Sequence, residues 1–132
     1  MEYNVYKGMT FELEKTVTKN DTAEHFGSGG IAVLATPVMI GWMENAAMNA
    51  VKSSLPEGYD TVGTNVTVDH LAATPVGMDV RVVAEVTEVN GRMIEFSVKA
   101  YDEKDKIGSG THQRAIIESE RFLKKVYGKI EK

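Results

Sequence analysis

A single long helical segment between segments with strand patterns constrains the fold of this chain more than any other feature. Thr36-Pro37 opens the helix, because threonine is a good N-cap and proline is favoured at the first helical position. The helical pattern runs to about Ser54, and Pro56 stops it. Before the helix, residues 9–18 alternate apolar and polar side chains, which predicts a strand. One helix must therefore cover one face of whatever sheet the remaining segments form.

Four more strands are predicted after the helix, at residues 61–73, 78–89, 92–101 and 107–118. Asn90-Gly91, between the second and third of these, is the strongest short hairpin signal in any sequence. Residues 19–30 predict a loop with a helical turn, and residues 119–132 predict a short basic amphipathic helix. The layout is α+β: one curled antiparallel sheet with one helix on one face. The other face is left for solvent or a partner subunit, and dimerisation is one common way to protect a sheet edge.

Composition narrows the class of protein. A length of 132 residues predicts one domain, residues 1–132, that can bury a sizeable core. The chain has no cysteine, which excludes disulfides and thiolate catalysis, and its three scattered histidines make a weak case for a metal. A net charge of −4 argues against nucleic acid as a partner. No apolar stretch is long enough to span a bilayer or act as a signal peptide, so we expect a cytoplasmic protein without a membrane partner.

Glu44 is the most informative single residue. On a helical wheel it falls among Ile40, Ala47 and Met48 rather than on the polar stripe that includes Asn45. A carboxylate on the apolar side is costly unless it is paired, hydrogen-bonded or protonated. Two interpretations stay open: Glu44 has a functional role, or it sits at the border of the polar stripe and reaches water.

His70 and Thr36 are the other candidates for chemistry. His70 shares strand parity with Val66 and Val68, so we expect it to face the helix, although a bulge in the strand would reverse that parity. It is then either a core histidine or a proton carrier. Thr36 is by itself an ordinary helix cap, but a helix N-terminus offers free N–H groups and partial positive charge, which suit a developing oxyanion. Sequence spacing does not show whether Thr36, Glu44 and His70 meet.

Two further residues point toward a ligand without identifying it. Gly63 interrupts a predicted strand, which indicates either a bulge or close approach of the backbone to a ligand. Arg114 lies in a strand rich in small residues, as a surface or interface ion-pair partner or as a contact for a phosphate or pantetheine group. His25 and His112 have no spacing that suggests a metal site.

Three segments carry a resemblance to a known family. They read TPVMIGWMENAAM (36–48), VGTNVTVDHLAATPVGM (62–78) and IGSGTHQRAII (107–117). Together they resemble the fluoroacetyl-CoA thioesterase and its wider group of hotdog thioesterase-like proteins, over about residues 9–120. The resemblance implies a hotdog fold, in which a curved antiparallel sheet wraps one long helix, and a homodimer with active sites at the subunit interface.

The same resemblance implies the roles of individual residues. Thr36, Glu44 and His70 match the family's catalytic threonine, glutamate and histidine, and Gly63 and Arg114 match its substrate-side glycine and arginine. The expected activity is hydrolysis of a short or small acyl-CoA to a free acid and CoA, with CoA as part of the substrate and no separate cofactor.

One segment departs from the family pattern. Where the fluoroacetyl-CoA enzyme carries lid and gate phenylalanines, this chain has Gly27 and Gly30, so we expect hydrolysis without the fluoroacetyl gate. Two alternatives stay open. A non-catalytic acyl-CoA-binding hotdog domain would bind tightly without releasing thiol, and a hotdog hydratase or dehydratase would remove the absorbance of an enoyl-CoA.

Overall fold

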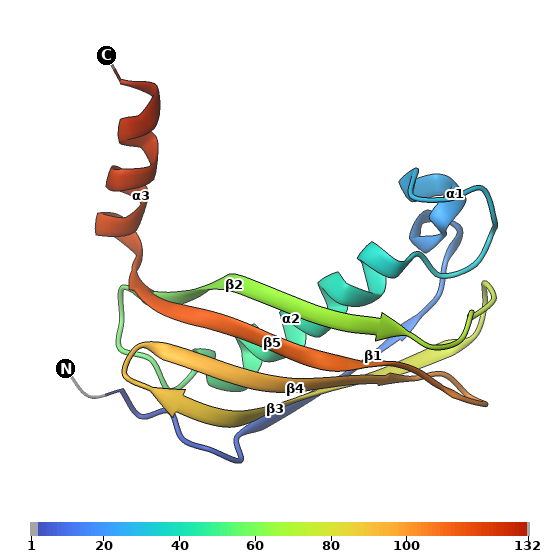
Figure 1. The fold of residues 1–132 in the computed structure, drawn as a ribbon, viewed down its shortest axis with the longest axis horizontal. Coiled ribbons are helices and arrows are strands. Elements are labelled where there is room, and N and C mark those ends of the chain that lie inside the picture. The colour runs from blue at the N-terminus through green and yellow to red at the C-terminus, as the bar shows by residue number, and fades with distance from the viewer. Residues whose placement is uncertain (1–2, 132) are drawn as a thin grey trace.

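The computed structural model describes residues 3–131, which form a five-stranded antiparallel sheet with one long helix on its face (Figure 1). The strands are β1 (Thr10–Thr16), β2 (Tyr59–His70), β3 (Asp79–Asn90), β4 (Met93–Tyr101) and β5 (Lys106–Glu118), in the sheet order β1-β3-β4-β5-β2. The helices are η1 (Lys19–Asp21), α1 (Ala23–Phe26), α2 (Thr36–Lys52), α3 (Ser119–Tyr127) and η2 (Gly128–Ile130). The predicted order of one strand, one helix and four strands is confirmed. That residues 1–132 form one domain stays a prediction, and Met1, Glu2 and Lys132 lie outside the described residues.

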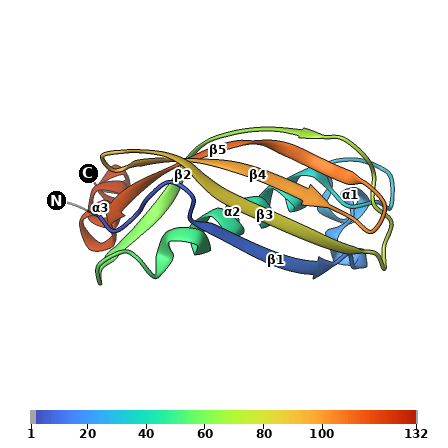
Figure 2. The ribbon, with the colours of Figure 1, turned by 90° about the horizontal axis from the view of Figure 1, so that it is seen from below.

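The core forms where α2 lies within the curve of the sheet (Figure 2). Strands β3 and β4 alternate buried and more exposed residues, so one face of each is apolar and meets the helix. Phe96, Ile94 and Val82 on these strands are fully buried with Met39 and Met43 of α2. Burial of such side chains contributes about 1.5–3 kcal/mol each.

The buried face of α2 differs from the predicted one. The side chains in the core belong to Met39, Met43, Ala46, Ala47, Ala50 and Val51. Ile40, Glu44 and Met48 form a neighbouring stripe that is only half-buried. The reason is that α2 packs mainly on β3 and β1, so the stripe containing Glu44 is turned toward β2 at the sheet edge. The N-cap prediction for Thr36 is also wrong, since Ala35 is the N-cap and Thr36 is the first helical residue.

A β-bulge in β2 decides which of its residues face the helix. The pairing with β5 runs Gly63 to Arg114, then shifts, and resumes toward His70 opposite Gly108. Gly63 and His70 are seven residues apart, so in a regular strand they would face opposite sides of the sheet. The extra residue after Gly63 reverses the parity and turns both positions toward α2.

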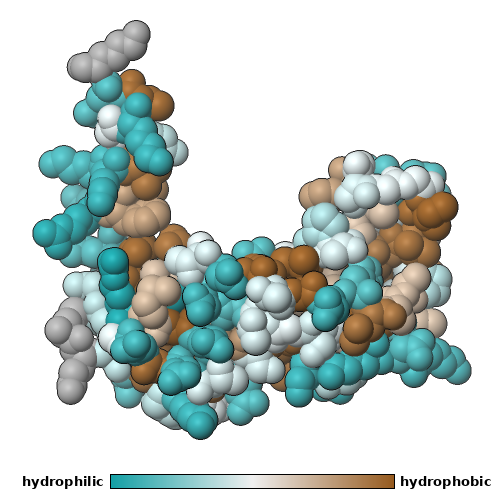
Figure 3. All heavy atoms as spheres, in the orientation of Figure 1, coloured by the Kyte–Doolittle hydropathy of each residue, from teal (hydrophilic) through white to brown (hydrophobic). Residues whose placement is uncertain are grey.

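The edge formed by β2 is flanked by two projections. The predicted amphipathic helix is confirmed as α3, which rises from the sheet at one end, while α1 rises at the other end (Figure 1). Leu123, Val126 and Tyr127 of α3 are exposed. A hollow lies between the two projections, above β2 (Figure 3). Among residues 3–131, no helix is long and apolar enough to cross a membrane.

Candidate active site

Thr36 and His70 form one hydrogen-bonded pair at the start of α2. Their Oγ1 and Nδ1 atoms are 2.6 Å apart, which is a short hydrogen bond. The prediction that His70 faces the helix is confirmed. In a neutral imidazole with its proton on Nε2, Nδ1 accepts from the hydroxyl of Thr36 and increases its nucleophilic character.

The other nitrogen of His70 is enclosed by protein. Nε2 is buried and has no hydrogen-bond partner among the described residues. Burial lowers the pKa of His70 from its ordinary value, against a smaller raising effect of the Ala72 backbone. A lowered pKa keeps the imidazole neutral near pH 7, the form in which it acts as a base.

A cavity of about 430 Å³ adjoins the Thr36–His70 pair. Its walls come from the segment around α1, the start of α2 and the end of β2, namely Ala23, Ser28, Val33, Leu34, Thr36, Pro37, His70, Leu71, Ala72 and Ala73. Most of these residues have apolar side chains, and the polar ones are Ser28 and the pair itself. A pocket with an apolar wall and a few convergent polar groups suits the acyl end of a small thioester.

The start of α2 offers fewer backbone donors than the sequence suggested. The N–H of Ala35 donates to Asp21, the N–H of Val38 donates to Ala35, and Pro37 has none. Within residues 3–131 only the N–H of Thr36 is left without a backbone acceptor in this turn. Any oxyanion stabilisation at this end therefore rests on the Thr36 N–H and hydroxyl and on the partial positive charge of the helix.

Glu44 belongs to a second cluster, farther along α2. A Cβ built on Gly63 would lie 3.3 Å from Oε2 of Glu44, 3.3 Å from Cε1 of His112 and 3.7 Å from Nη1 of Arg114. Glu44 of α2 and His112 and Arg114 of β5 therefore surround the space that a side chain at position 63 of β2 would occupy. No hydrogen bond or ion pair ties the Glu44 carboxylate to another residue in the described part of the chain.

Arg114 is held in place inside this cluster. Its Nε donates to the Thr61 hydroxyl at 2.8 Å, its Nη2 donates to the Thr61 carbonyl at 2.9 Å, and its Nη1 is 3.2 Å from Nε2 of His112. Burial lowers the pKa of Arg114, while Glu44 and Asp60 act to raise it. The interpretation of Arg114 as a surface residue is wrong, because its side chain is only 7% exposed.

The two clusters do not meet within one chain. Eight residues of helix separate Thr36 from Glu44, which corresponds to about 12 Å along the axis. The structure thus brings together Thr36 with His70, and Glu44 with Gly63 and Arg114, but not all three predicted catalytic residues. Their catalytic and substrate-binding roles stay predictions.

Sequence reasoning missed His112. The spacing of the histidines bears only on metal binding, yet His112 is 1% exposed and its ring lies against Arg114. A usable signal was present: His112 and Arg114 are two apart on one strand, so they share a face. The described residues contain no group of acidic and histidine side chains arranged to hold a metal ion.

The segment before the helix is open around Gly27 and Gly30. Gly27 ends α1 with a φ of 94°, a left-handed conformation that favours glycine, and a Cβ at Gly27 or Gly30 would meet nothing within 4 Å. Phe26 is 56% exposed rather than packed over the Thr36–His70 cavity. The expectation that the fluoroacetyl gate is missing stays a prediction.

Comparison with known proteins agrees with this architecture. A sequence profile of the fluoroacetyl-CoA-specific thioesterases matches residues 17–120. The fluoroacetyl-CoA thioesterase of Streptantibioticus cattleyicolor is 47% identical over 94 residues, which cover 71% of this chain and 68% of that protein. A crystal structure of the fluoroacetyl-CoA thioesterase FlK superposes with a TM-score of 0.89 at 38% identity, covering 95% of this chain and 97% of that one.

More distant structures share the same fold. A Thermus thermophilus protein described as a thioesterase superfamily member gives a TM-score of 0.87 at 30% identity over 96% of each chain. A hot-dog-like protein from Thermanaerovibrio acidaminovorans gives 0.88 at 25% identity, over 96% of this chain and 93% of that one. The sheet wrapped on α2 is therefore a hotdog fold of the thioesterase class, as predicted. The chain belongs to the family of fluoroacetyl-CoA-specific thioesterases.

Proposed function

We propose that this chain hydrolyses the thioester of a small acyl-CoA to a free acid and CoA. The observation that carries the proposal is the 2.6 Å contact between the Thr36 hydroxyl and Nδ1 of His70 beside a cavity at the helix start. Family membership supports the reaction class, since the relative from Streptantibioticus cattleyicolor is a fluoroacetyl-CoA thioesterase. Membership does not select the acyl group, and the glycines before α2 argue against fluoroacetyl-CoA as the natural substrate.

In this proposal His70 accepts the proton of the Thr36 hydroxyl or of a water held by it. The oxygen then attacks the carbonyl carbon, the C–S bond breaks, and the leaving thiolate takes up the proton. When the attacking oxygen is that of Thr36, a water that gives its proton to His70 then hydrolyses the acyl-threonine ester, which releases the acid and returns the proton to Thr36. Glu44 is the alternative base or nucleophile, contributed by the other subunit of the dimer proposed below, and Gly63 and Arg114 form the wall on which the substrate lies. Direct attack by Thr36 leaves an acyl-enzyme that mass spectrometry detects after rapid acid quenching, whereas attack by water leaves none.

The proposal is tested by the release of free thiol from a panel of acyl-CoAs, including acetyl-CoA and fluoroacetyl-CoA. We expect the H70N variant to lose at least about 100-fold in kcat, because a general base contributes about 10²–10⁴. The control is H25N, which alters an exposed histidine outside both clusters and should leave the rate unchanged. No thiol release from any acyl-CoA by the wild type would overturn the proposal, as would an H70N variant as active as H25N.

We also propose that the functional form is a homodimer with sites at the interface. The support is the exposed middle of β2 at a sheet edge, the half-buried stripe of Ile40, Glu44 and Met48 beside it, and the hollow framed by α1 and α3. Thr36 and Glu44 lie four residues before and after Ile40. Two antiparallel copies of α2 that cross near Ile40 would therefore bring Glu44 of one level with Thr36 of the other.

Complementation tests this arrangement. We expect inactive T36A and inactive E44A, mixed and allowed to exchange subunits, to recover about a quarter of wild-type activity, because half of the dimers are mixed and each has one intact site. Mixing either variant with itself is the control. Sedimentation as a monomer, or no recovery in a mixture proven to contain mixed dimers, would contradict the shared site.

We propose that no cofactor is needed apart from the CoA portion of the substrate, because the reaction requires only proton transfer and oxyanion stabilisation. Activity that survives dialysis against a strong chelator would agree with this.

A cytoplasmic location is proposed from the absence of cysteine.

A further inference from the structure

We propose that His112 is a positioning residue that, as a neutral Nδ1–H imidazole, fixes the guanidinium of Arg114 beside Glu44. The inference rests on the proposed function, because Glu44 matters only if the chain hydrolyses thioesters. His112 has no role in the proposed reaction, yet it is one of the most completely buried polar side chains described.

The hydrogen bonds of His112 select a single tautomer. Nδ1 lies 2.7 Å from the carbonyl oxygen of Asn65, and a carbonyl can only accept, so Nδ1 must carry the proton. Nε2 lies 3.2 Å from Nη1 of Arg114, and a guanidinium can only donate, so Nε2 must be free to accept. Two independent contacts thus require the same neutral ring.

The ring itself cannot easily turn. It stacks on Phe96, with centroids 6.0 Å apart and planes at 29°, and the bulge in β2 presents the Asn65 carbonyl to it. The acceptor atom for Arg114 is therefore placed by β2 and β4 together, not by β5 alone. A rigid acceptor is what a positioning role requires.

Arg114 in turn is fixed through all of its nitrogens. The contacts with Thr61 hold Nε and Nη2, and His112 holds Nη1, the nitrogen that lies nearest to the space over Gly63. One N–H on each terminal nitrogen stays available for a carboxylate or a ligand. Without His112 the Nη1 end would lose its only partner among the described residues.

The positive charge of Arg114 is the reason that the His112 ring must stay neutral. The charged groups close to His112 and Arg114 are Glu44 from α2 and Asp60 from β2. A protonated His112 would lose its acceptor atom and place a second cation against Arg114. The guanidinium would then be pushed away from the position it holds beside Glu44.

The wild-type protein gives the first test, which is independent of catalysis. Nitrogen-15 NMR of histidine-labelled protein at pH 7, assigned with the H25N and H70N variants, should show His112 as a single neutral Nδ1–H tautomer. An Nε2–H tautomer or an imidazolium at that pH would overturn the proposal.

A matched pair of variants gives the second test. H112Q places an amide oxygen near the position of Nε2, whereas H112N keeps a donor near Nδ1 and removes the acceptor for Arg114. We expect H112N to lose roughly 100-fold in kcat with KM little changed, because displacement of about 1 Å at a site has that effect. H112Q should recover most of the loss, while both variants melt at similar temperatures.

The two tests separate the possible failures. Equal kcat for H112N and H112Q, or kcat in proportion to melting temperature, would overturn the positioning role and leave a buried core histidine. If the wild type hydrolyses no acyl-CoA, the proposed function fails first. The NMR result then still decides whether His112 is the Nδ1–H tautomer that can accept from Arg114, and an Nε2–H tautomer or an imidazolium overturns the inference by itself.

Discussion

The cluster around Glu44 and Arg114 depends on Gly63 having no Cβ. The sequence left two interpretations, a bulge or close approach of the backbone to a ligand. The structure places a bulge directly after Gly63 and also brings the side chains of Glu44 and His112 to its surface. The bulge is therefore confirmed, while close approach of a ligand stays a prediction.

We expect Gly63→Ala to lower kcat about 10-fold, since a contact at 3.3 Å displaces Glu44 or His112 by a few tenths of an ångström. Thiol release measures the effect. Gly128→Ala is the matched control, because a Cβ there meets open space, and its free energy of unfolding should change by no more than about 0.5 kcal/mol. Wild-type kcat in Gly63→Ala would show that the space over Gly63 is not used.

Among the secondary-structure elements, α2 and β2 each have one feature that local sequence patterns do not predict. The bounds of α2 and the strands were predictable from alternation, Pro56 and Asn90-Gly91, because these signals are local. The buried stripe of α2 was not predictable from the sequence. Apolar residues occupy two adjacent sides of its helical wheel, and the wheel does not show which of these sides packs against the sheet. The bulge in β2 was equally hidden, since it depends on the pairing with β5.

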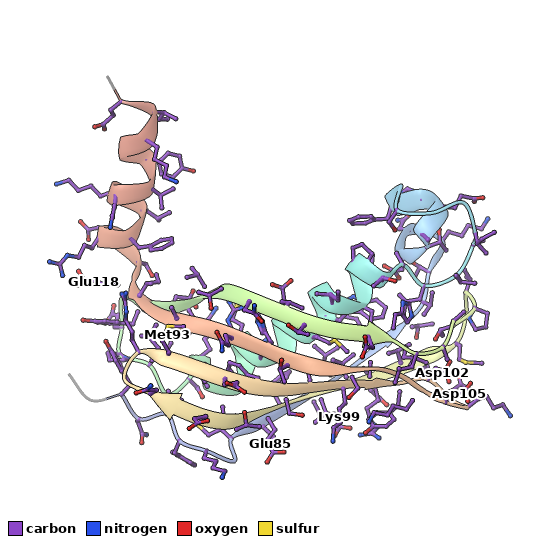
Figure 4. The ribbon with its side chains drawn as sticks, in the orientation of Figure 1. Glu85, Met93, Lys99, Asp102, Asp105 and Glu118 are labelled. Carbon is purple, nitrogen blue, oxygen red and sulfur yellow. The ribbon has the colours of Figure 1, made fainter. Side chains whose placement is uncertain are left out.

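The turn between β4 and β5 leads to a prediction about the free energy of unfolding. Asp102, labelled with Asp105 in Figure 4, accepts hydrogen bonds from the N–H groups of Lys104 and Asp105 and from the Thr74 hydroxyl, at 2.7–2.9 Å. We expect Asp102→Ala to reduce the free energy of unfolding by about 1–2 kcal/mol. Asp105→Ala, whose side chain makes no hydrogen bond among the described residues, should change it by less than about 0.5 kcal/mol in urea titrations. Equal losses would contradict the role of the Asp102 carboxylate.

For the whole molecule, the buried His112 and the half-buried His70 make the free energy of unfolding depend on pH. Burial lowers the pKa of His112 and of His70 below the ordinary value of 6.5. The unfolded chain then binds more protons than the folded one below about pH 6.5, so stability is complete above that pH and falls as the pH decreases. Urea unfolding at pH 7.5 and 5.5 measures the loss, and H70N should reduce it. Stability that rises on acidification across this range would contradict the prediction.

The architecture as a whole was predictable, but the site was only partly so. The α+β layout followed from period and turn signals, and family resemblance gave the hotdog fold. That His70 faces the helix followed from strand parity, which was right because the bulge precedes Val66, but its contact with Thr36 did not follow from any spacing. The separation of Glu44 from that pair, and the part played by His112, depend on which helix face meets which strand, and no local pattern encodes that.

The order of strands in the sheet also has a consequence for how the protein is made. Among residues 3–131, strand β2 pairs only with β5, the last of the five strands, which inserts between β4 and β2. Once the chain has emerged from the ribosome as far as Tyr101, β1, β3 and β4 can associate, but β2 has no neighbour. The edge that carries Gly63 and His70 therefore stays exposed until β5 has emerged, and this interval is when the nascent chain is most open to aggregation or to a chaperone.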